Sequence, residues 1–300
     1  MANSSIPDSL RKHEIPGRVA VAAGGGGLPK LKVTSDGSAA EIYLHGAHVT
    51  QFQKRGEPPL LFLSRKSWFA PGQPIRGGVP ICLPWFGARE GGPAHGPARL
   101  TEWQLMKTAA AGGSVTLEFA LPQNFSGRTW QNLRAELSVT VADGLTMELA
   151  ATNESPGETL EIENCLHTYF YLGDIGAAGL SGLEGAAYDD YASGAAGERR
   201  REDGAVLKIT RETNRIYPGH TGAVEIRDEQ LRRTIRVEKF NSRSTVVWNP
   251  WTTQQLPDDF DPAEHRQMVC VESGNVKQDK LSLAPGERAS LRVVVSSRKF

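Results

Sequence analysis

Hydrophobic and polar residues alternate with a period of two along most of the chain. Segments 40–52, 114–121 and 133–153 follow this pattern, which is typical of antiparallel strands that bury one face. In the last segment, Asp143-Gly144 separates two alternating runs and predicts a two-residue β-hairpin turn. We expect further strands of the same kind in segments 160–173, 222–240, 244–251, 266–274 and 288–298.

The fold class follows from this pattern and from the lack of a helical one. No window of about 12 residues carries an apolar stripe at helical spacing. The spacing of the strands suits an all-β protein, a large antiparallel β-sandwich, rather than βαβ units. We predict one domain over residues 28–300, preceded by a poorly constrained N-terminal strand or tail over 1–27. The small-residue tract 176–203 is expected to form a surface excursion.

Composition limits the class of partner. Among 300 residues, 34 Lys and Arg balance 34 Asp and Glu, so no global field attracts nucleic acid or an acidic membrane surface. The N-terminal residues lack the apolar core of a signal peptide, and no run of about 18 apolar residues occurs. Three cysteines without a Cys-x-x-Cys pair do not form a disulfide framework. We expect a cytoplasmic monomer without nucleic-acid or membrane partners.

Arginines gather in one turn-prone segment, 75–103, which reads "IRGGVPICLPWFGAREGGPAHGPARLTEW". Guanidinium groups grip a phosphate or carboxylate with two parallel hydrogen bonds, and neighbouring glycines let backbone N–H groups approach an anion. Arg76 in "RGG" and His95 with Arg99 in "HGPAR" therefore suit an anion or polyol pocket. Composition alone favours the alternative, surface arginines in loops.

Two residues break the apolar alternation in ways that suit proton transfer. His167 interrupts the aromatic segment "ENCLHTYFYLGD", and histidine can transfer a proton near neutral pH. Glu272 follows the apolar run "MVCV", where partial burial would raise its pKa toward that of a general base. The alternatives are a core histidine with satisfied hydrogen bonds and a strand-end glutamate exposed to water.

Other chemistry finds less support in the sequence. The stretch "VVWNPW" at 246–251 offers tryptophans that could floor a carbohydrate site or simply plug one end of a sandwich. The histidines and cysteines match no zinc-binding spacing. Neither a nucleophile elbow nor a phosphate or dinucleotide loop is present. We therefore expect no metal and no cofactor.

Six motifs in this order resemble the aldose 1-epimerase (galactose mutarotase-like) superfamily, and within it the hexose-6-phosphate mutarotases. The resemblance extends from about residue 31 to the C-terminus. It rests on "PIRGGVPICLPWFG", "HGPARLTEW", "LHTYFYLGD", "ETNRIY", "VVWNPW" and "VCVESGNV". It implies a large antiparallel sandwich with an active cleft on one sheet, and an isomerase that interconverts the α and β anomers of a hexose 6-phosphate, with glucose 6-phosphate as the expected substrate.

The resemblance also implies roles for individual residues. His167 matches the catalytic acid and Glu272 the catalytic base. Arg76 and Arg99 match positions that contact the sugar phosphate, and His95 matches the second histidine of the cleft. Asn214 in "ETNRIY" stands where the family commonly has Asp and is the expected contact to a sugar hydroxyl. The chain departs from the family in three further places, at Ala94 and Pro97 of "AHGPAR" and at Ser273 after Glu272.

The implied mechanism opens and closes the sugar ring. Glu272 takes the proton of the anomeric hydroxyl while His167 protonates the ring oxygen, and closure after rotation about C1–C2 reverses both transfers. Two alternatives share the arginines and tryptophans: a carbohydrate-binding sandwich without catalysis, and a mutarotase of unphosphorylated aldoses. A lyase or isomerase acting on an acidic sugar is a third. The sequence leaves the sugar epimer, the oligomeric state and the pathway open.

Overall fold

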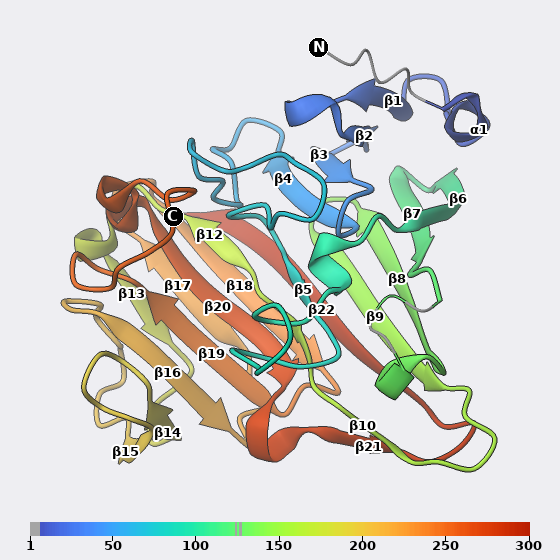
Figure 1. Ribbon diagram of the computed structural model, residues 1–300. Helices are drawn as coiled ribbons and strands as arrows, with labels where there is room; N and C mark the ends of the chain where they lie inside the picture. The colour runs from blue at the N-terminus through green and yellow to red at the C-terminus, as the bar shows by residue number, and fades with distance from the viewer. Residues whose placement is uncertain (1–6, 124, 126–127) are drawn as a thin grey trace.

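The strands form two large antiparallel sheets packed face to face, with a smaller sheet at one end (Figure 1). This computed structural model describes residues 7–123, 125 and 128–300. The sheet that carries the site, here the cleft sheet, has the order β15-β14-β16-β19-β20-β11-β5, with β12 also paired to β20. Its strands are β5 (Ile81–Cys82), β11 (Asn164–Leu166), β12 (Tyr169–Tyr171), β14 (Ala187–Asp190), β15 (Glu198–Arg201), β16 (Thr213–Pro218), β19 (Ser244–Asn249) and β20 (Met268–Asn275).

The second large sheet, here the back sheet, has the order β13-β17-β18-β22-β9-β8-β7-β6. Its strands are β6 (Gln104–Ala111), β7 (Ser114–Ala120), β8 (Leu133–Val141), β9 (Leu145–Asn153), β13 (Ala178–Ser181), β17 (Val224–Asp228), β18 (Arg233–Phe240) and β22 (Arg288–Lys299).

Smaller elements complete the fold. A four-stranded sheet contains β1 (Val19–Ala23), β2 (Pro29–Thr34), β3 (Ser38–Tyr43) and β4 (His48–Lys54), and a ribbon pairs β10 (Leu160–Ile162) with β21 (Leu281–Leu283). The helices are short: α1 (Asp8–Arg11), η1 (Gly25–Gly27), η2 (Ala98–Leu100), η3 (Arg128–Trp130), η4 (Ile175–Ala177), η5 (Pro262–Gln267) and η6 (Lys277–Asp279). None of the helices in these described ranges is long and apolar enough to cross a membrane. The all-β sandwich prediction is confirmed.

Alternation along β19 and β20 divides their side chains between the core and the cleft. Val247, Val269 and Val271 belong to the main hydrophobic cluster, together with residues of the back sheet. The intervening residues point to the opposite face, where Trp248 and Glu272 line a cavity. Successive residues of a strand point to opposite sides of the sheet, so one face holds the two sheets together while the other carries chemistry.

The hairpin predicted at Asp143-Gly144 is confirmed, with one difference. β8 and β9 pair from Leu133↔Asn153 to Val141↔Leu145, so the loop between them also includes Ala142 and is one residue longer than predicted.

The two segments predicted to be loosely structured contain ordered strands. Residues 1–6 of the N-terminal segment lie outside the described residues. Within the rest of it, β1 pairs along its whole length with β2, and its apolar residues join the main core. The prediction of a surface excursion over 176–203 is wrong, because the segment forms three strands. β13 belongs to the back sheet, and β14 and β15 belong to the cleft sheet. Glu202, at the end of this tract, is largely buried and pairs with Arg215 at 2.7 Å.

Candidate active site

A cavity of about 480 Å³ opens on the outer face of the cleft sheet. All six candidate residues predicted from the sequence line it, although they come from four separate parts of the chain. Its walls are formed by Arg76, Phe86, Gly87, Ala88, Ala94, His95, Arg99, His167, Tyr169, Tyr191, Asn214, Ile216, Val246, Trp248, Gln254, Gln255, Leu256, Pro257, Glu272 and Lys277. Binding sites for small molecules are typically concave and of this size.

His167 and Glu272 face each other because of the register between two strands. Leu166 pairs with Ser273 in β11–β20, and Tyr169 pairs with Cys270 in β12–β20. This register places His167 directly opposite Glu272, on the same face of the sheet. The Nε2 atom of His167 lies 3.3 Å from Oε1 of Glu272, so a proton can pass between the two side chains or between each of them and a ligand.

Burial shifts the pKa values of both groups toward their neutral forms. His167 is 7% exposed and Glu272 is 1% exposed, so the alternative of a water-exposed strand-end glutamate is wrong. Desolvation lowers the pKa of His167 well below its ordinary value, and the charges of His95, Arg99 and Arg76 lower it further. Desolvation likewise raises the pKa of Glu272 well above its ordinary value. Both shifts favour the uncharged forms of the two groups, a protonated carboxyl on Glu272 and a neutral imidazole on His167.

His95 closes one side of the cleft above His167. The two rings meet edge to face, with centroids 5.3 Å apart, and Phe86 packs on the other side of His95 at 4.8 Å. The backbone N–H of Gly87 donates to Nδ1 of His95 at 3.3 Å. Since Nδ1 accepts this bond, the ring proton of a neutral His95 is on Nε2, where it can donate a hydrogen bond to a ligand.

Arg76 is held by a buried carboxylate. Its Nε and Nη2 atoms each lie 3.2 Å from an oxygen of Asp259, whose side chain is fully buried. Its Nη1 atom donates to the hydroxyl of Tyr169 at 3.3 Å. The backbone is fixed as well, because its N–H donates to Ser67 and its carbonyl accepts from Ser64. Asp259 therefore neutralises the charge of Arg76 and fixes its orientation.

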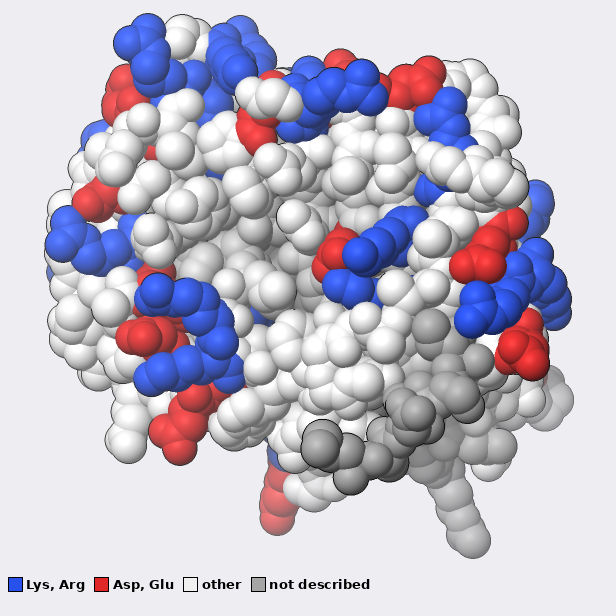
Figure 2. Space-filling view, turned by 90° about the horizontal axis from the view of Figure 1, so that it is seen from above, with Lys and Arg blue, Asp and Glu red and all other residues white. Residues whose placement is uncertain are grey.

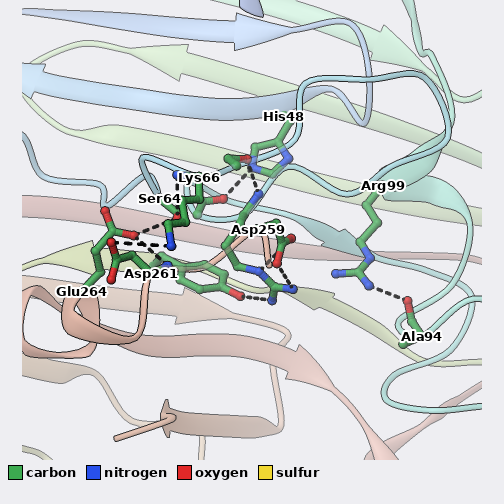
Figure 3. A network of polar contacts seen from close by, with 12 residues as sticks. His48, Ser64, Lys66, Ala94, Arg99, Asp259, Asp261 and Glu264 are labelled. Atoms are coloured by element: carbon green, nitrogen blue, oxygen red, sulfur yellow. Dashed lines mark hydrogen bonds and ion pairs between the residues drawn. The ribbon is translucent and has the colours of Figure 1, made fainter. Parts of the chain in front are cut away.

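Arg99, in contrast, has no carboxylate partner among the described residues. It is 9% exposed, and its Nη2 atom donates to the carbonyl of Ala94 at 2.8 Å. Its buried Nε atom has no hydrogen-bond partner in the described chain. Figure 3 shows Asp259 facing the guanidinium group with which it pairs, and Arg99 lying apart and reaching toward Ala94. A buried cation with unused donors is suited to an anionic ligand. The alternative of surface arginines in loops is therefore wrong for Arg99.

Aromatic and amide side chains form the floor and the opposite wall. Tyr169 stacks on His167 with centroids 4.8 Å apart, and Trp248 meets both rings edge to face. Asn214 on β16 is the cross-strand neighbour of Trp248. Of the two tryptophans in "VVWNPW", Trp248 lines the cleft, whereas Trp251 packs against His265. Of the two tryptophans expected to form the floor of a carbohydrate site, only Trp248 therefore lines the cavity.

One group of side chains in the described ranges could hold a metal ion. The ligand atoms of His167, Cys270 and Glu272 lie within 4.8 Å of one another, and all three residues are buried. Imidazole, thiolate and carboxylate are ligands that Zn²⁺ accepts. A cation held here would occupy both groups of the facing acid–base pair, so metal binding and proton transfer by this pair exclude each other.

Two residues important for the charge of the cleft were not predicted from the sequence. Asp259 occurs in "LPDDF", and nothing in that motif distinguishes it from its exposed neighbour Asp258. Lys277 lies at the start of η6 with a left-handed backbone (φ 54°). Its side chain lies beside Gly87 in the cavity wall. If Gly87 carried a Cβ atom, that atom would be 3.6 Å from Nζ of Lys277. Its place after "VCVESGNV" is the only sequence signal, because the same motif carries Glu272.

Comparison with known proteins agrees with this geometry. The sequence model of the aldose 1-epimerase family matches residues 29–296. A protein of Cenchrus ciliaris named "Putative glucose-6-phosphate 1-epimerase" is 33% identical over 271 residues, which cover 86% of this chain and 81% of that protein. A protein of Escherichia coli K12 with the same name is 35% identical over 241 residues, covering 78% of this chain and 79% of the relative.

Solved structures show the same architecture. The crystal structure of a "putative mutarotase" from Salmonella typhimurium superposes with a TM-score of 0.87 and 26% identity, over 96% of both chains. A galactose mutarotase-like protein from Clostridium acetobutylicum gives a TM-score of 0.72 at 13% identity, over 94% of this chain and 98% of the other, a likeness of fold alone. The chain is an isomerase that belongs to the aldose 1-epimerase family.

Proposed function

We propose that the protein interconverts the α and β anomers of a hexose 6-phosphate, with glucose 6-phosphate as the substrate. The observation that carries the proposal is the buried pair His167 and Glu272, with Nε2 and Oε1 3.3 Å apart, beside a buried Arg99 that has no carboxylate partner among the described residues. The acid–base pair suits ring opening, and the unpaired cation suits the phosphate. The names of the relatives from Cenchrus ciliaris and Escherichia coli support the same substrate.

The reaction needs one group to accept a proton and another to donate one at the same time. With the acidic proton of the pair on His167, the Glu272 carboxylate takes the proton from the anomeric hydroxyl and the His167 imidazolium gives one to the ring oxygen, so the C1–O5 bond breaks and an aldehyde forms. After rotation about C1–C2, the ring closes as both transfers run backward. The pair carries one acidic proton before and after the cycle. Each positioned transfer contributes about 10²- to 10⁴-fold, sufficient for a reaction that also proceeds in water.

Charge in the cleft supports a phosphorylated sugar over a neutral one. Asp259 offsets Arg76 at 3.2 Å, while Arg99 and Lys277 line the cavity without a carboxylate partner in the described part of the chain. A phosphate monoester carries close to two negative charges at neutral pH, which would match these two cations. Held at one end, the sugar is aligned for proton transfer at C1 by binding energy from its remote phosphate.

The remaining cleft residues are assigned to the sugar hydroxyls. We place His95 and Asn214 in this role, and also Arg76, which the resemblance had assigned to the phosphate but whose charge Asp259 offsets. Each presents a hydrogen-bond donor to the cavity. Trp248 and Tyr169 provide apolar faces for the C–H surface of the ring. No metal or nucleotide enters this scheme, because the two side chains balance the protons by themselves.

The test is anomer exchange of glucose 6-phosphate and free glucose, followed by NMR with and without the protein. We expect exchange to be faster with the protein, with a lower KM for the phosphate ester. Arg99→Met should raise that KM at least tenfold, because a charge-assisted contact is worth about 1.5–3 kcal/mol, and should change the KM for glucose far less.

Arg89→Met is the matched control. Arg89 belongs to the same glycine-rich segment, but its guanidinium stacks on Trp85 and Trp130 and does not line the cavity. The Arg89→Met substitution should leave the KM for glucose 6-phosphate and the KM for glucose unchanged. Binding of the sugar without faster exchange would support a carbohydrate-binding sandwich instead. Equal effects of Arg99→Met on both sugars would remove the phosphate assignment.

A further inference from the structure

Two buried thiols lie directly beneath the cleft residues. Cys82 on β5 and Cys165 on β11 are cross-strand partners, and both are fully buried and free. The Sγ atom of Cys165 lies 3.6 Å from Oε2 of Glu272, and that of Cys82 lies 3.5 Å from Nδ1 of His95. Each thiol has one proton to donate. Cys82 and Cys165 also contact each other, so Cys165 has two acceptors within reach, the Cys82 sulfur and Oε2 of Glu272.

The strand register brings Cys165 to Glu272. Cys165 pairs with Gly274, two residues beyond Glu272 and on the same face of the sheet. A Cβ atom on Gly274 would come within 2.8 Å of the Cβ of Cys165, so any larger residue there would force the cysteine away. The missing side chain therefore allows Cys165 to reach diagonally across the sheet to the carboxyl group.

The surroundings leave Glu272 few other partners. Cys82 and Cys165 belong to a small apolar cluster with Phe86, Ile216, Val246 and Val276. Among the described residues, the polar contacts of Glu272 are Nε2 of His167 through one oxygen and the Cys165 thiol through the other. A carboxylate in an apolar environment depends strongly on each donor that remains, even on a weak S–H donor.

We propose that Cys165 is a positioning residue of this enzyme, whose thiol donates to Oε2 of Glu272 and holds Oε1 toward His167 and the anomeric hydroxyl. The inference rests on the proposed role of Glu272 in proton transfer. Cys165 touches no reacting atom and acts only through the carboxyl group. It stabilises the charged form of Glu272 against the desolvation that opposes it, and it prevents rotation of the carboxyl plane away from the substrate.

The experiment compares Cys165→Ala, which removes the donor, with Cys165→Ser, which keeps one. Loss of the donor disfavours the carboxylate, so Cys165→Ala should move the alkaline limb of the pH profile of kcat upward by about half to one unit. It should also lower kcat about 3- to 10-fold, with KM nearly unchanged. Cys165→Ser should return the limb to the wild-type position or below it, because a hydroxyl is the stronger donor.

Val276→Ala is the matched control, since Val276 is fully buried in the same apolar cluster and has no polar group. It should lower the unfolding temperature without moving the pH profile. A wild-type profile in Cys165→Ala would overturn the proposal, and so would an equal shift in Val276→Ala. Absence of catalysis by the unmodified protein would instead refute the proposed function, so the two failures are distinguishable.

A second measurement does not depend on catalysis or on the folding of a cysteine variant. The S–H stretching band of a thiol moves when its hydrogen-bond acceptor changes. We expect the infrared spectrum of Glu272→Gln to show one S–H band displaced relative to the unmodified protein, because the acceptor of the Cys165 thiol changes from a carboxyl group to an amide. An unchanged S–H spectrum would overturn the contact between Cys165 and Glu272.

Discussion

At the scale of single residues, the proposed chemistry of the cleft depends on His167 and Glu272 acting together in a desolvated site. Their mutual distance of 3.3 Å and nearly complete burial make them a unit rather than two independent groups. Each can therefore serve as acid in one direction of the reaction and as base in the other. A variant that fixes the protonation state of either residue should remove most of the catalysis.

Glu272→Gln is the direct test of the proton acceptor. The amide keeps the size of the side chain but cannot accept the proton of the anomeric hydroxyl. We expect kcat for anomer exchange to fall about 10²-fold or more, while binding of glucose 6-phosphate changes much less. NMR exchange rates give the first quantity and calorimetric titration the second. Turnover close to that of the unmodified protein would remove Glu272 from the proton transfer.

The pH dependence follows from the directions of the two pKa shifts. Activity needs one proton on the pair. On the acid side, activity falls when His167 also gains a proton, and its lowered pKa places this limb below 6.5. On the alkaline side, activity falls when Glu272 loses its proton, and its raised pKa places this limb above 4.5. We therefore expect a plateau between the lowered pKa of His167 and the raised pKa of Glu272.

The profile should be measured as kcat/KM with glucose as well as glucose 6-phosphate, because the phosphate itself titrates near pH 6. A limb that occurs only with the phosphate ester belongs to the substrate. A bell centred on the ordinary pKa of either residue would contradict the burial of the pair.

At the scale of elements, the turn after Arg76 sets the position of that arginine. Gly78 has a φ of 62°, and a Cβ atom there would lie 2.3 Å from the carbonyl oxygen of Val49 and 2.9 Å from Nε2 of His48. The same Nε2 atom contacts the carbonyl of Gly77 at 2.7 Å. β4 therefore packs directly against the turn, which has no room for a side chain.

Gly78→Ala should consequently reduce both stability and substrate binding. The left-handed backbone alone costs about 1–3 kcal/mol for a residue other than glycine, and the clash with Val49 adds to it. We expect the free energy of unfolding to fall by about 2 kcal/mol or more and the KM for glucose 6-phosphate to rise as Arg76 shifts. Chemical denaturation and steady-state kinetics measure the two effects.

Gly56→Ala is the control for backbone strain alone. Gly56 has a φ of 73°, and a Cβ atom added there would meet no other atom within 4 Å. The substitution should cost less stability than Gly78→Ala and leave KM unchanged. Equal losses in both variants would show that the close packing of β4 on the turn does not matter.

At the scale of the whole molecule, balanced charge makes the anion preference a local property. Figure 2 shows Lys and Arg mixed with Asp and Glu on one face, without a continuous field of either sign. Exposed large apolar side chains are few in the described chain: Trp68, Met106, Tyr191, Val206, Phe240 and Phe300. Two of them, Phe240 and Phe300, are covered by arginines. We therefore still predict a monomer, which light scattering can test.

Ligand binding should stabilise the folded chain through the same local charge. At a concentration 100 times Kd, a ligand adds about 2.7 kcal/mol to the free energy of unfolding, which raises Tm by several degrees in a domain of this size. We expect this shift with glucose 6-phosphate, a much smaller one with glucose, and a reduced one in Arg99→Met. Differential scanning calorimetry measures it. Equal shifts with both sugars would show that the phosphate adds nothing to binding and would argue against its contact with Arg99.

The sequence by itself determined the fold class, most of the longer strands and the candidate residues. Period-two alternation shows directly which side chains a strand buries. The six motifs, which follow one another in the family's order, contain the candidate residues. The sequence did not reveal β13 to β15 within 176–203, because these strands of four residues, such as "AGLS" and "ERRR", are too short to show apolar alternation. The ordered β1 was also underestimated, since its stability comes from pairing with β2.

Only the tertiary structure decided how these residues act together. The register of β20 against β11 and β12 places Glu272 opposite His167 and within reach of Cys165. Asp259, 183 positions away in the chain, offsets Arg76, whereas Arg99 has no such partner among the described residues. The physical reason is that pKa shifts and charge balance depend on distance and burial. Both are set by packing between segments far apart in the sequence, and no local pattern records them.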